Sequence, residues 1–303
     1  MSKIVIVGSI SMDLVMKTNR IAQEGETVFG DSFAMVPGGK GANQAVAVGR
    51  LAAQKDQINM LGAVGEDSFG YLLLQNLADN GLNVDFVGTV PSSSGIAQIT
   101  IFNHDNRIIY CPGANGEVDT TLWEKEWDLL EAADLVILQN EIPHQANLGI
   151  AQFCHDKGIK VLYNPAPARE TDKEMLDLVT YFTPNQHEVQ ELFPDKELDT
   201  ILEAYPNRLI VTLGTKGSTY FDGQVIQLIP AIKTEAIDTT GAGDTFNGAF
   251  GFAVSKGLDM RESLKFATLA SHLSVQQFGA QGGMPTLSEM KEHDAYEKAW
   301  DFE

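Results

Sequence analysis

The feature that most constrains this chain is the alternation of short apolar runs with amphipathic stretches. The runs of strand type are KIVIVG from Lys3, LVILQ from Leu135, KVLYN from Lys160 and LIVTLG from Leu209. Helical periodicity follows Gly41, returns over residues 67–79 and 144–157, and continues near the C-terminus. Because parallel strands need crossover helices, this alternation predicts an α/β fold in which a mostly parallel sheet has helices on both faces.

Two regions break this rhythm, at about residues 13–36 and 90–113. In the second, GIAQITIF and RIIYC flank His104, Asp105 and Asn106, which are turn residues, so a β-hairpin is predicted. We expect both regions to form a small accessory sheet beside the strand ends of the core. Such a sheet serves either as a lid that excludes water from a reaction or as an oligomer surface.

The composition fits one compact domain over residues 1–303. A chain of this length with 44% apolar residues can bury a large core without covalent links. The only cysteines, Cys111 and Cys154, match no metal-ligand spacing and give no disulfide framework, which favours a cytoplasmic location. The N-terminal MSKIVIVGS is expected to be a buried strand rather than a signal peptide, and no later apolar run suffices to span a bilayer.

The formal net charge of −20 argues against nucleic acids and anionic membranes as partners, since both repel such a surface. The charge does not exclude a nucleotide. ATP arrives with magnesium and is held by local backbone amides and a few side chains, so one site can oppose the net charge of the whole protein.

The most informative stretch is AIDTTGAGDTFNGAFGFAV, residues 236–254, where a glycine-rich turn leads into a helix of small residues. Gly241 and Gly243 allow close approach of the backbone, and a helix N-terminus presents free amides. Such a turn binds anions. Asp244 at its mouth is placed to take a proton from a hydroxyl while the amides stabilise a transferring phosphoryl group. The alternative is that Asp244 only caps the helix.

Two motifs nearer the N-terminus suit a sugar. PGGKGANQA, residues 37–45, surrounds Lys40 with glycines, and Lys40 and Asn43 provide donors for hydroxyl groups. GSISMD places Asp13 after the first predicted strand, at the edge where ligands of open parallel sheets collect, and Asp13 can accept from vicinal hydroxyls. The alternatives are a flexible turn with a solvated lysine and an aspartate that caps a turn.

Three further stretches suit a ligand at the same edge. Glu141 follows LVILQ and points to this crevice, or caps the next helix. Asn185 and Glu188 of TPNQHE are three residues apart and suit the hydration shell of magnesium, although both types are common in a first helical turn. VTLGTKG, residues 211–217, suits a nucleotide that rests on the backbone and equally suits a hairpin.

Together, GSISMD, PGGKGANQA, TPNQHE, VTLGTKG, DTTGAGDTFNG and FGAQGGMP resemble, in order and spacing, the ribokinase (PfkB-type) family of carbohydrate kinases. The resemblance covers essentially the whole chain, and the combination of DTTGAGDTFNG with GGKGANQA is highly specific. It implies a ribokinase-like fold, with a central mostly parallel sheet flanked by helices and a small β-sheet lid. It also implies an ATP-dependent phosphotransferase whose acceptor is an alcohol.

The resemblance assigns Asp244 as the catalytic base and Asn185 and Glu188 to magnesium. The sugar-binding residues that it implies are Ser11, Asp13, Gly38, Gly39, Lys40, Asn43, Glu141 and Asp244. Those implied for ATP are Asn185, Glu188, Thr212, Leu213, Gly214, Thr215, Lys216, Gly217, Gly241, Ala242, Gly243, Asp244 and Thr268. A potassium ion that activates the enzyme would be held by Asp238, Thr240, Ser274, Gln277, Gly279 and Gly283. The lid implies a homodimer, since a second copy covers its edges and apolar face.

One position departs from the family pattern. Ribokinases commonly carry asparagine two residues before the sugar-binding aspartate, and this chain has Ser11 there. Serine still donates and accepts a hydrogen bond but reaches less far. Either a water fills the gap or the preferred sugar differs, for instance 2-deoxyribose.

We therefore expect transfer of a phosphoryl group from MgATP to the 5-hydroxyl of D-ribose, giving D-ribose 5-phosphate and ADP. Alternatives are a kinase for 2-deoxyribose, fructose, a nucleoside such as adenosine, or a phosphosugar. The phosphosugar would need more cations near the lid than Lys17 and Arg20. From another class, the chain could be a non-catalytic sugar- or nucleotide-binding regulator. A dinucleotide-dependent dehydrogenase is disfavoured because Gly8 is not followed by GxGxxG spacing.

Overall fold

The computed structural model of the protein describes residues 1–103 and 105–302, and its centre is a six-stranded sheet in the order β10-β9-β8-β1-β4-β5. The strands are β1 (Lys3–Val7), β4 (Gln57–Gly65), β5 (Val87–Val90), β8 (Leu135–Gln139), β9 (Lys160–Asn164) and β10 (Tyr181–Phe182). Every pairing in this sheet is parallel. The predicted α/β class with a mostly parallel central sheet is therefore confirmed.

An antiparallel group of strands extends the sheet beyond β10. It contains β11 (Ile210–Thr212), β12 (Ser218–Phe221) and β13 (Ile226–Ile229). Isolated parallel bridges, Phe182 to Leu209 and Asn185 to Thr212, connect β11 to the edge of the central sheet. The predicted strand LIVTLG is shorter than expected, because the chain turns at Gly214 and at Gly217, whose φ of 105° favours glycine. VTLGTKG thus forms the hairpin that the sequence left open.

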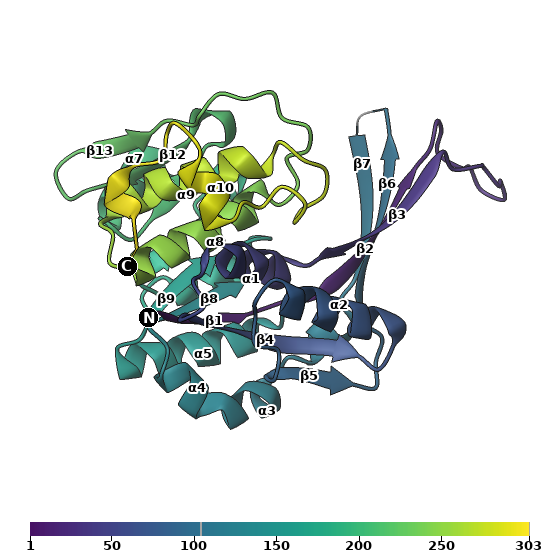
Figure 1. Ribbon diagram of the computed structural model, residues 1–303, viewed down its shortest axis with the longest axis horizontal. Helices are drawn as coiled ribbons and strands as arrows, with labels where there is room; N and C mark the ends of the chain where they lie inside the picture. Colours follow the sequence, from purple (N-terminus) through teal and green to yellow (C-terminus); the bar gives the residue numbers. More distant parts are fainter. Residues whose placement is uncertain (104, 303) are drawn as a thin grey trace.

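Helices cover both faces of the central sheet (Figure 1). One face carries α1 (Lys40–Leu51), α2 (Ser68–Asp79), α8 (Ala242–Ser255), α9 (Met260–Ser274) and α10 (Leu287–Lys291). The other carries α3 (Thr120–Trp123), α4 (Trp127–Glu131), α5 (His144–Lys157), α6 (Gln186–Leu192) and α7 (Leu198–Ala204). Short 3-10 helices are η1 (Gly113–Glu117), η2 (Glu124–Glu126), η3 (Glu170–Met175), η4 (Gly214–Lys216) and η5 (Lys298–Trp300).

Strand β1 explains why its sequence is apolar without interruption. Ile4 and Ile6 pack into the core under α1 and α8, whereas Val5 and Val7 pack into the core under α5. Since side chains alternate along a strand, a strand buried on both faces needs an apolar residue at every position. Among the described helices, none has both the length and the apolar character needed to cross a membrane.

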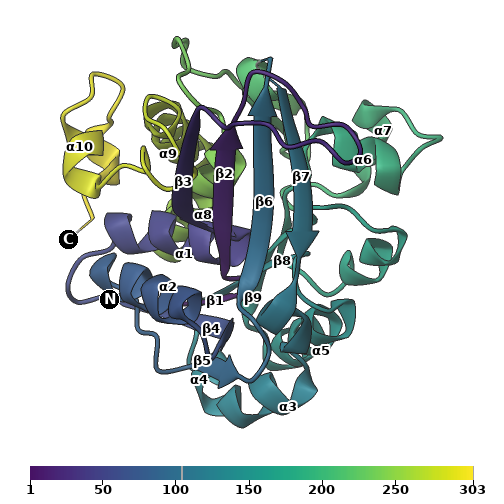
Figure 2. The same cartoon turned by 90° about the vertical axis from the view of Figure 1, so that its right-hand side faces the viewer.

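A second sheet projects from the core on the right of Figure 1 and faces the viewer in Figure 2. Its strands, in the order β3-β2-β6-β7, are β2 (Ser11–Lys17), β3 (Ser32–Gly38), β6 (Gly95–Phe102) and β7 (Asp105–Cys111). Strands β2 and β6 are parallel, and the other two pairings are antiparallel. We call this sheet the lid.

The lid hairpin of β6 and β7 is tighter than predicted. Asp105 and Asn106 were expected in its turn, but both lie in β7, where Asp105 pairs with Phe102. The turn begins instead at Asn103, whose φ is 51°, a conformation that asparagine tolerates better than most residues. His104, the third predicted turn residue, lies outside the described residues.

Helices α1 and α8 approach each other closely at Gly248. A Cβ atom at this position would lie 2.7 Å from the carbonyl oxygen of Gln44 and 2.7 Å from the Cβ of Ala47. Because Gly248 has no side chain, the backbones of the two helices can approach each other this closely. This contact places the N-terminal turns of both helices, with their sequence motifs, beside the same edge of the sheet.

We predict that Gly248→Ala lowers the free energy of unfolding by about 1–3 kcal/mol, although alanine favours helix, because the methyl group forces α1 and α8 apart. Urea denaturation measures this change. Gly116→Ala is the matched control, since its new methyl group would lie 3.7 Å from the nearest atom, Cβ of Pro112. Equal effects of the two substitutions would contradict the importance of the helix contact.

Candidate active site

Polar residues from several elements meet where the parallel strands end. Ser9 follows β1, Glu141 follows β8, and Asn164 is the last residue of β9. The amide of Ala42 in the first turn of α1 donates to the carbonyl of Ser9 over 2.8 Å, which fixes the start of α1 above β1. Since ligands of open parallel sheets bind at the carboxyl ends of the strands, this edge is the candidate site.

Asp244 is a buried carboxylate at this edge that two side-chain amides hold in place. It is 6% exposed. Its Oδ2 accepts from Nδ2 of Asn43 (2.9 Å), and its Oδ1 accepts from Nε2 of Gln44 (3.1 Å). Asp244 does not cap α8, because the cap residue is Gly241 with φ of 77°. Each oxygen keeps a lone pair free, so the carboxylate can accept a further proton donor.

Gln44 fixes Asp244 from inside the protein. Gln44 is fully buried, and its Nε2 also lies 3.2 Å from Oδ1 of Asn164. Its Oε1 accepts from Nε2 of Gln139 over 2.9 Å. These partners come from the ends of β8 and β9, so the orientation of Asp244 depends on the central sheet as well as on α1.

Glu141 and Asp13 lie close enough together for the charge of Glu141 to raise the pKa of Asp13. Oε2 of Glu141 accepts from the hydroxyl of Ser9 (2.6 Å) and from the backbone amide of Lys40 (2.9 Å). Asp13 lies on the lid against Gly38, where an added Cβ atom would be 2.6 Å from Oδ2 of Asp13. Burial, and then the charges of Glu141 and Asp244, raise the pKa of Asp13 to about 7.

Lys40 provides the positive charge among these carboxylates. Lys40 is the first residue of α1, after Gly39, whose φ is 87°. The charge of Asp244 raises the pKa of Lys40 most strongly; burial opposes this, and Glu141 and Glu188 raise it further. The lysine therefore links the carboxylates of the expected sugar and nucleotide sites electrostatically.

Asn185 and Glu188 form the capping box of α6. Oδ1 of Asn185 accepts from the amides of His187 and Glu188, and Oε2 of Glu188 accepts from the amide of Asn185 over 2.7 Å. The capping alternative is thus present in the structure. Oε1 of Glu188 is left outside the box. The pKa of Glu188 is raised above its ordinary value, because the effect of burial outweighs the opposing effects of the Asn185 amide and of Lys40. A single free carboxylate oxygen is a suitable ligand for magnesium, because this ion usually keeps several water ligands when a protein binds it.

The segments expected to bind ATP come from several elements, and of them Glu188 is close enough to Asp244 for the charge of Asp244 to raise its pKa. The bridge between Asn185 and Thr212 joins α6 to β11, which leads into Leu213, Gly214, Thr215, Lys216 and Gly217. At the start of α8, a Cβ atom on Gly243 would have no atom within 4 Å, so this turn is open for a ligand. The amide of the adjacent Ala242 donates to the carbonyl of Thr239. Thr268 donates within its own helix, to Leu264, and has no hydrogen bond to the other expected ATP residues described.

The residues expected to bind potassium come from two loops that touch. Oδ1 of Asp238 accepts from the amide and hydroxyl of Thr240, and Oδ2 accepts from the amide of Gly279 over 2.9 Å. Gly283 packs so closely on Ser274 that an added Cβ atom would be 2.0 Å from its carbonyl oxygen. The exposed Gln277 lies between Ser274 and Gly279 in the chain and makes no side-chain hydrogen bond within the part that the structure describes.

Sequence reasoning missed several residues of the site. Nε2 of Gln281 donates to Oδ1 of Asn43 over 2.9 Å, and Oε1 of Gln281 accepts from Asn76. Gln44 and Gln281 both lie inside motifs that the sequence singled out, but their partners depend on how distant segments pack. Asn115 and Tyr110, which contact Ser11 or its neighbours, carried no signal in the sequence.

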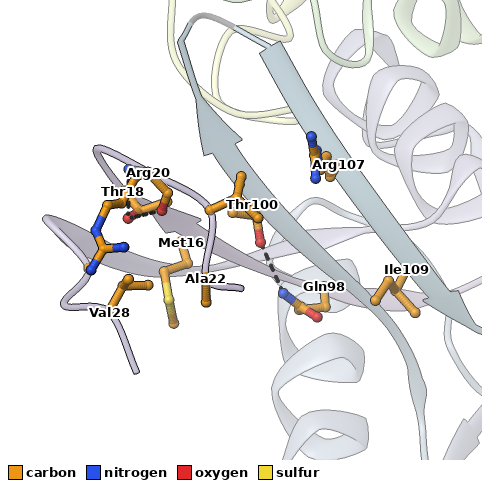
Figure 3. Close-up of a pocket in the computed structure, with 11 residues that line it drawn as sticks. Met16, Thr18, Arg20, Ala22, Val28, Gln98, Thr100, Arg107 and Ile109 are labelled. Atoms are coloured by element: carbon orange, nitrogen blue, oxygen red, sulfur yellow. Dashed lines mark hydrogen bonds between the residues drawn. The ribbon is translucent and has the colours of Figure 1, made fainter. Parts of the chain in front are cut away.

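A separate hollow of about 300 Å³ lies on the face of the lid opposite the one that carries Asp13 (Figure 3). Met16, Gln98, Thr100 and Ile109 line it together with residues of the loop between β2 and β3. Asp13 and Met16 are three positions apart on β2, so their side chains point to opposite faces of the sheet. This hollow is therefore not part of the candidate active site.

Comparisons with known proteins find relatives over nearly the whole chain. The model of the pfkB family carbohydrate kinases matches residues 1–287. The chain is 58% identical to ribokinase of Lactococcus lactis subsp. lactis over 291 residues, 96% of either chain. It is 44% identical to Bacillus subtilis ribokinase, covering 96% of this chain and 99% of the relative. The structure of Arabidopsis thaliana ribokinase complexed with ribose and ATP superposes with a TM-score of 0.88 at 30% identity, over 96% of this chain and 98% of that one.

Asp13 is predicted to make stability depend on pH. Its pKa is about 7 when folded and near 3.8 when unfolded, so the folded protein binds more protons between these values. The stabilisation is complete below pH 3.8 and is lost as pH rises through 7. Between pH 4.5 and 8, the free energy of unfolding of the wild-type protein should fall as Asp13 loses its proton. In Asp13→Asn this fall should be smaller by about 2–4 kcal/mol, as measured by urea denaturation. The exposed control Asp195→Asn should keep the wild-type decline; identical declines in all three proteins would refute the effect.

Proposed function

The chain belongs to the pfkB family of carbohydrate kinases, and from this premise we propose that it phosphorylates D-ribose at the 5-hydroxyl with ATP, giving D-ribose 5-phosphate and ADP. The observation that carries the proposal is the placement of Asp244, a carboxylate held by Asn43 and Gln44 beside the open first turn of α8. Ribokinases that align with nearly the whole chain support ribose as the acceptor.

Asp244 would act as the base. A sugar hydroxyl donates its proton to a free lone pair of the carboxylate while the oxygen attacks the terminal phosphorus of ATP. The amides at the start of α8, including that of Gly243, face the transferring group and stabilise the charge that develops on its oxygens. Lys40 adds a positive charge close to Asp244.

The other end of the sugar would lie between the lid and the core. Asp13 and Glu141 accept from sugar hydroxyls, with Gly38, Gly39 and Asn43 around them. Hydroxyl groups that donate to Asp13 favour its charged form, so sugar binding is expected to lower the pKa of Asp13 from about 7. The hydroxyl groups of the sugar would thus donate to carboxylates of the site, an arrangement that suits a neutral sugar.

Magnesium and potassium are the cofactors that we propose. Magnesium, bound through water to Asn185 and directly or through water to Oε1 of Glu188, would neutralise charge on the phosphates of ATP. Potassium would bind the loops that contain Asp238 and Ser274. This proposal is supported by the packing of Ala280 on Gly241, where an added Cβ atom would be 2.4 Å from the Ala280 carbonyl oxygen. An ion in these loops would therefore help to fix the start of α8.

We also propose a homodimer that forms through the lid. The lid face opposite Asp13 exposes Met16, Phe33, Met35 and Ile109, and the hollow of Figure 3 lies on the same face. A second copy would cover this apolar surface and the edges of the sheet. A cytoplasmic location is supported by the two cysteines, which are both free.

The alternatives are less well supported. Kinases for 2-deoxyribose, fructose or adenosine would keep the same base, and differ only in the contacts around Asp13. A non-catalytic regulator would be expected to have lost the base or the residues that orient it. Asp244, Asn43 and Gln44 are all in place, which favours an enzyme.

We predict that Asp244→Asn reduces turnover roughly 10²-fold or more while the protein stays folded, because the amide cannot accept the hydroxyl proton. ADP release from MgATP measures turnover with ribose, 2-deoxyribose, fructose, adenosine and fructose 6-phosphate, each with and without potassium. Ribose should be fastest, and the exposed control Asp195→Asn should match wild type. Near-normal activity of Asp244→Asn would remove Asp244 as the base, and no turnover with any acceptor would favour a binding protein.

The proposed dimer predicts a change in mass after one substitution. Phe33→Asp places a charge on a lid side chain that is 57% exposed, so it should convert a dimer to monomers in sedimentation velocity experiments. Tyr71→Asp is the control, because Tyr71 is a 69% exposed residue of α2 rather than of a lid strand, and this variant should stay dimeric. A monomeric wild-type protein would contradict the dimer.

A further inference from the structure

Tyr110 shares a row of the lid sheet with Asp13. Asp13 pairs with Ala97, and Ala97 pairs with Tyr110, so the three residues lie in register on adjacent strands. Residues directly opposite in a sheet project to the same face. Tyr110 therefore projects to the face that carries Asp13, and only the small side chain of Ala97 separates them in this row.

Asn115 joins Tyr110 to Ser11. Asn115, in η1, is fully buried and is fixed to the backbone of Ile10, whose amide donates to Oδ1 over 2.8 Å and whose carbonyl accepts from Nδ2 over 3.0 Å. The same Nδ2 lies 3.1 Å from Oγ of Ser11 and 3.2 Å from the hydroxyl oxygen of Tyr110, so these two acceptors share its second proton. Gly95 permits this approach, because a Cβ atom there would be 2.2 Å from Nδ2.

The hydrogen-bond roles leave the Tyr110 hydroxyl as a donor in the site. Its oxygen accepts from Asn115 and is hydrogen-bonded to Ser11, a bond that lowers the pKa of Tyr110 as a donated proton does, so the proton of Tyr110 itself stays free to donate. Burial raises the pKa of Tyr110, as do Glu141 and then Asp13, whereas its hydrogen bonds to Ser11 and Asn115 lower it. The phenol consequently stays protonated at neutral pH, and it lies within the influence of both sugar-site carboxylates.

We propose that Tyr110 is a further specificity-determining residue, whose hydroxyl is held by Asn115 and Ser11 and donates to one secondary hydroxyl of the sugar. Asp13 accepts the proton of that sugar hydroxyl, and Tyr110 donates to its oxygen. The proposal rests on the proposed sugar kinase function. Under this proposal, the short side chain of Ser11 acts on the sugar through Tyr110, which lies on the edge strand β7 of the lid.

This arrangement discriminates against a sugar that lacks the hydroxyl. Such a sugar would leave the half-buried Asp13 without its donor, and the hydroxyl of Tyr110, a residue that is 36% exposed, without the sugar oxygen as its acceptor. Unpaired polar groups in a partly buried site weaken binding, so the selectivity comes from their cost rather than from steric fit.

The test compares Tyr110→Phe with wild type on ribose, 2-deoxyribose and 3-deoxyribose, by ADP release from MgATP. The substitution keeps the ring and removes only the hydroxyl. We expect kcat/KM for ribose to fall roughly three- to tenfold, mainly through KM, because the contact lies away from the transferring phosphoryl group. For one of the two deoxy sugars, kcat/KM should remain within about twofold of wild type, which identifies the hydroxyl that Tyr110 reads.

Two further variants sharpen the result. Ser11→Ala should lower kcat/KM for ribose and spare the same deoxy sugar, since Ser11 helps to orient the Tyr110 hydroxyl toward that sugar oxygen. Tyr71→Phe, which removes a hydroxyl from an exposed tyrosine on α2, should change none of the three values. The inference fails if Tyr110→Phe affects all three sugars equally or none of them, while wild type still phosphorylates ribose. A wild-type protein inactive on ribose would instead overturn the proposed function on which the inference rests.

Discussion

The hydrogen bonds that hold Asp244 between Asn43 and Gln44 are the interaction on which the site depends. They join the first turns of two helices that are about 200 residues apart in sequence. The bonds are possible because α1 and α8 touch at Gly248, where backbone meets backbone without an intervening side chain. A loss of this contact would move the carboxylate away from its two amides. Packing in the core therefore decides the geometry of the chemistry at its edge.

The groups that orient Asp244 are neutral amides rather than cations. Gln44, Gln139 and Asn164 form a buried chain of hydrogen bonds below it, and Gln281 supports Asn43 from the side. Neutral donors fix the direction of a carboxylate without taking its role as an acceptor, as a bidentate arginine would. Within the described residues this chain of hydrogen bonds ends at Gln139, whose buried Oε1 has no hydrogen-bond partner, and each further amide left unpaired would cost about 1–3 kcal/mol.

Local patterns in the sequence predicted the elements, but distant contacts decided the details. The uninterrupted apolar run of β1 indicated a strand buried on both faces, and the glycines before Asp244 indicated the start of a helix. The hairpin turn was misplaced, because strand pairing extends β7 to Asp105. Asn185 and Glu188 were ambiguous, since one spacing serves both a capping box and a metal shell. The contact of Gln281 with Asn43 spans 238 residues, so no local pattern could reveal it.

The row formed by Asp13, Ala97 and Tyr110 has a consequence for how the lid can change in evolution. A shift of one residue in the pairing of β2 or β6 would turn Asp13 or Ala97 to the opposite face. Single-residue insertions or deletions within these strands would thus remove the sugar-facing surface even if the sheet still formed. The loop between β2 and β3 is free of this constraint, because loop length changes the free energy only slowly. Variation in length should accumulate there, while the strands keep their number of residues.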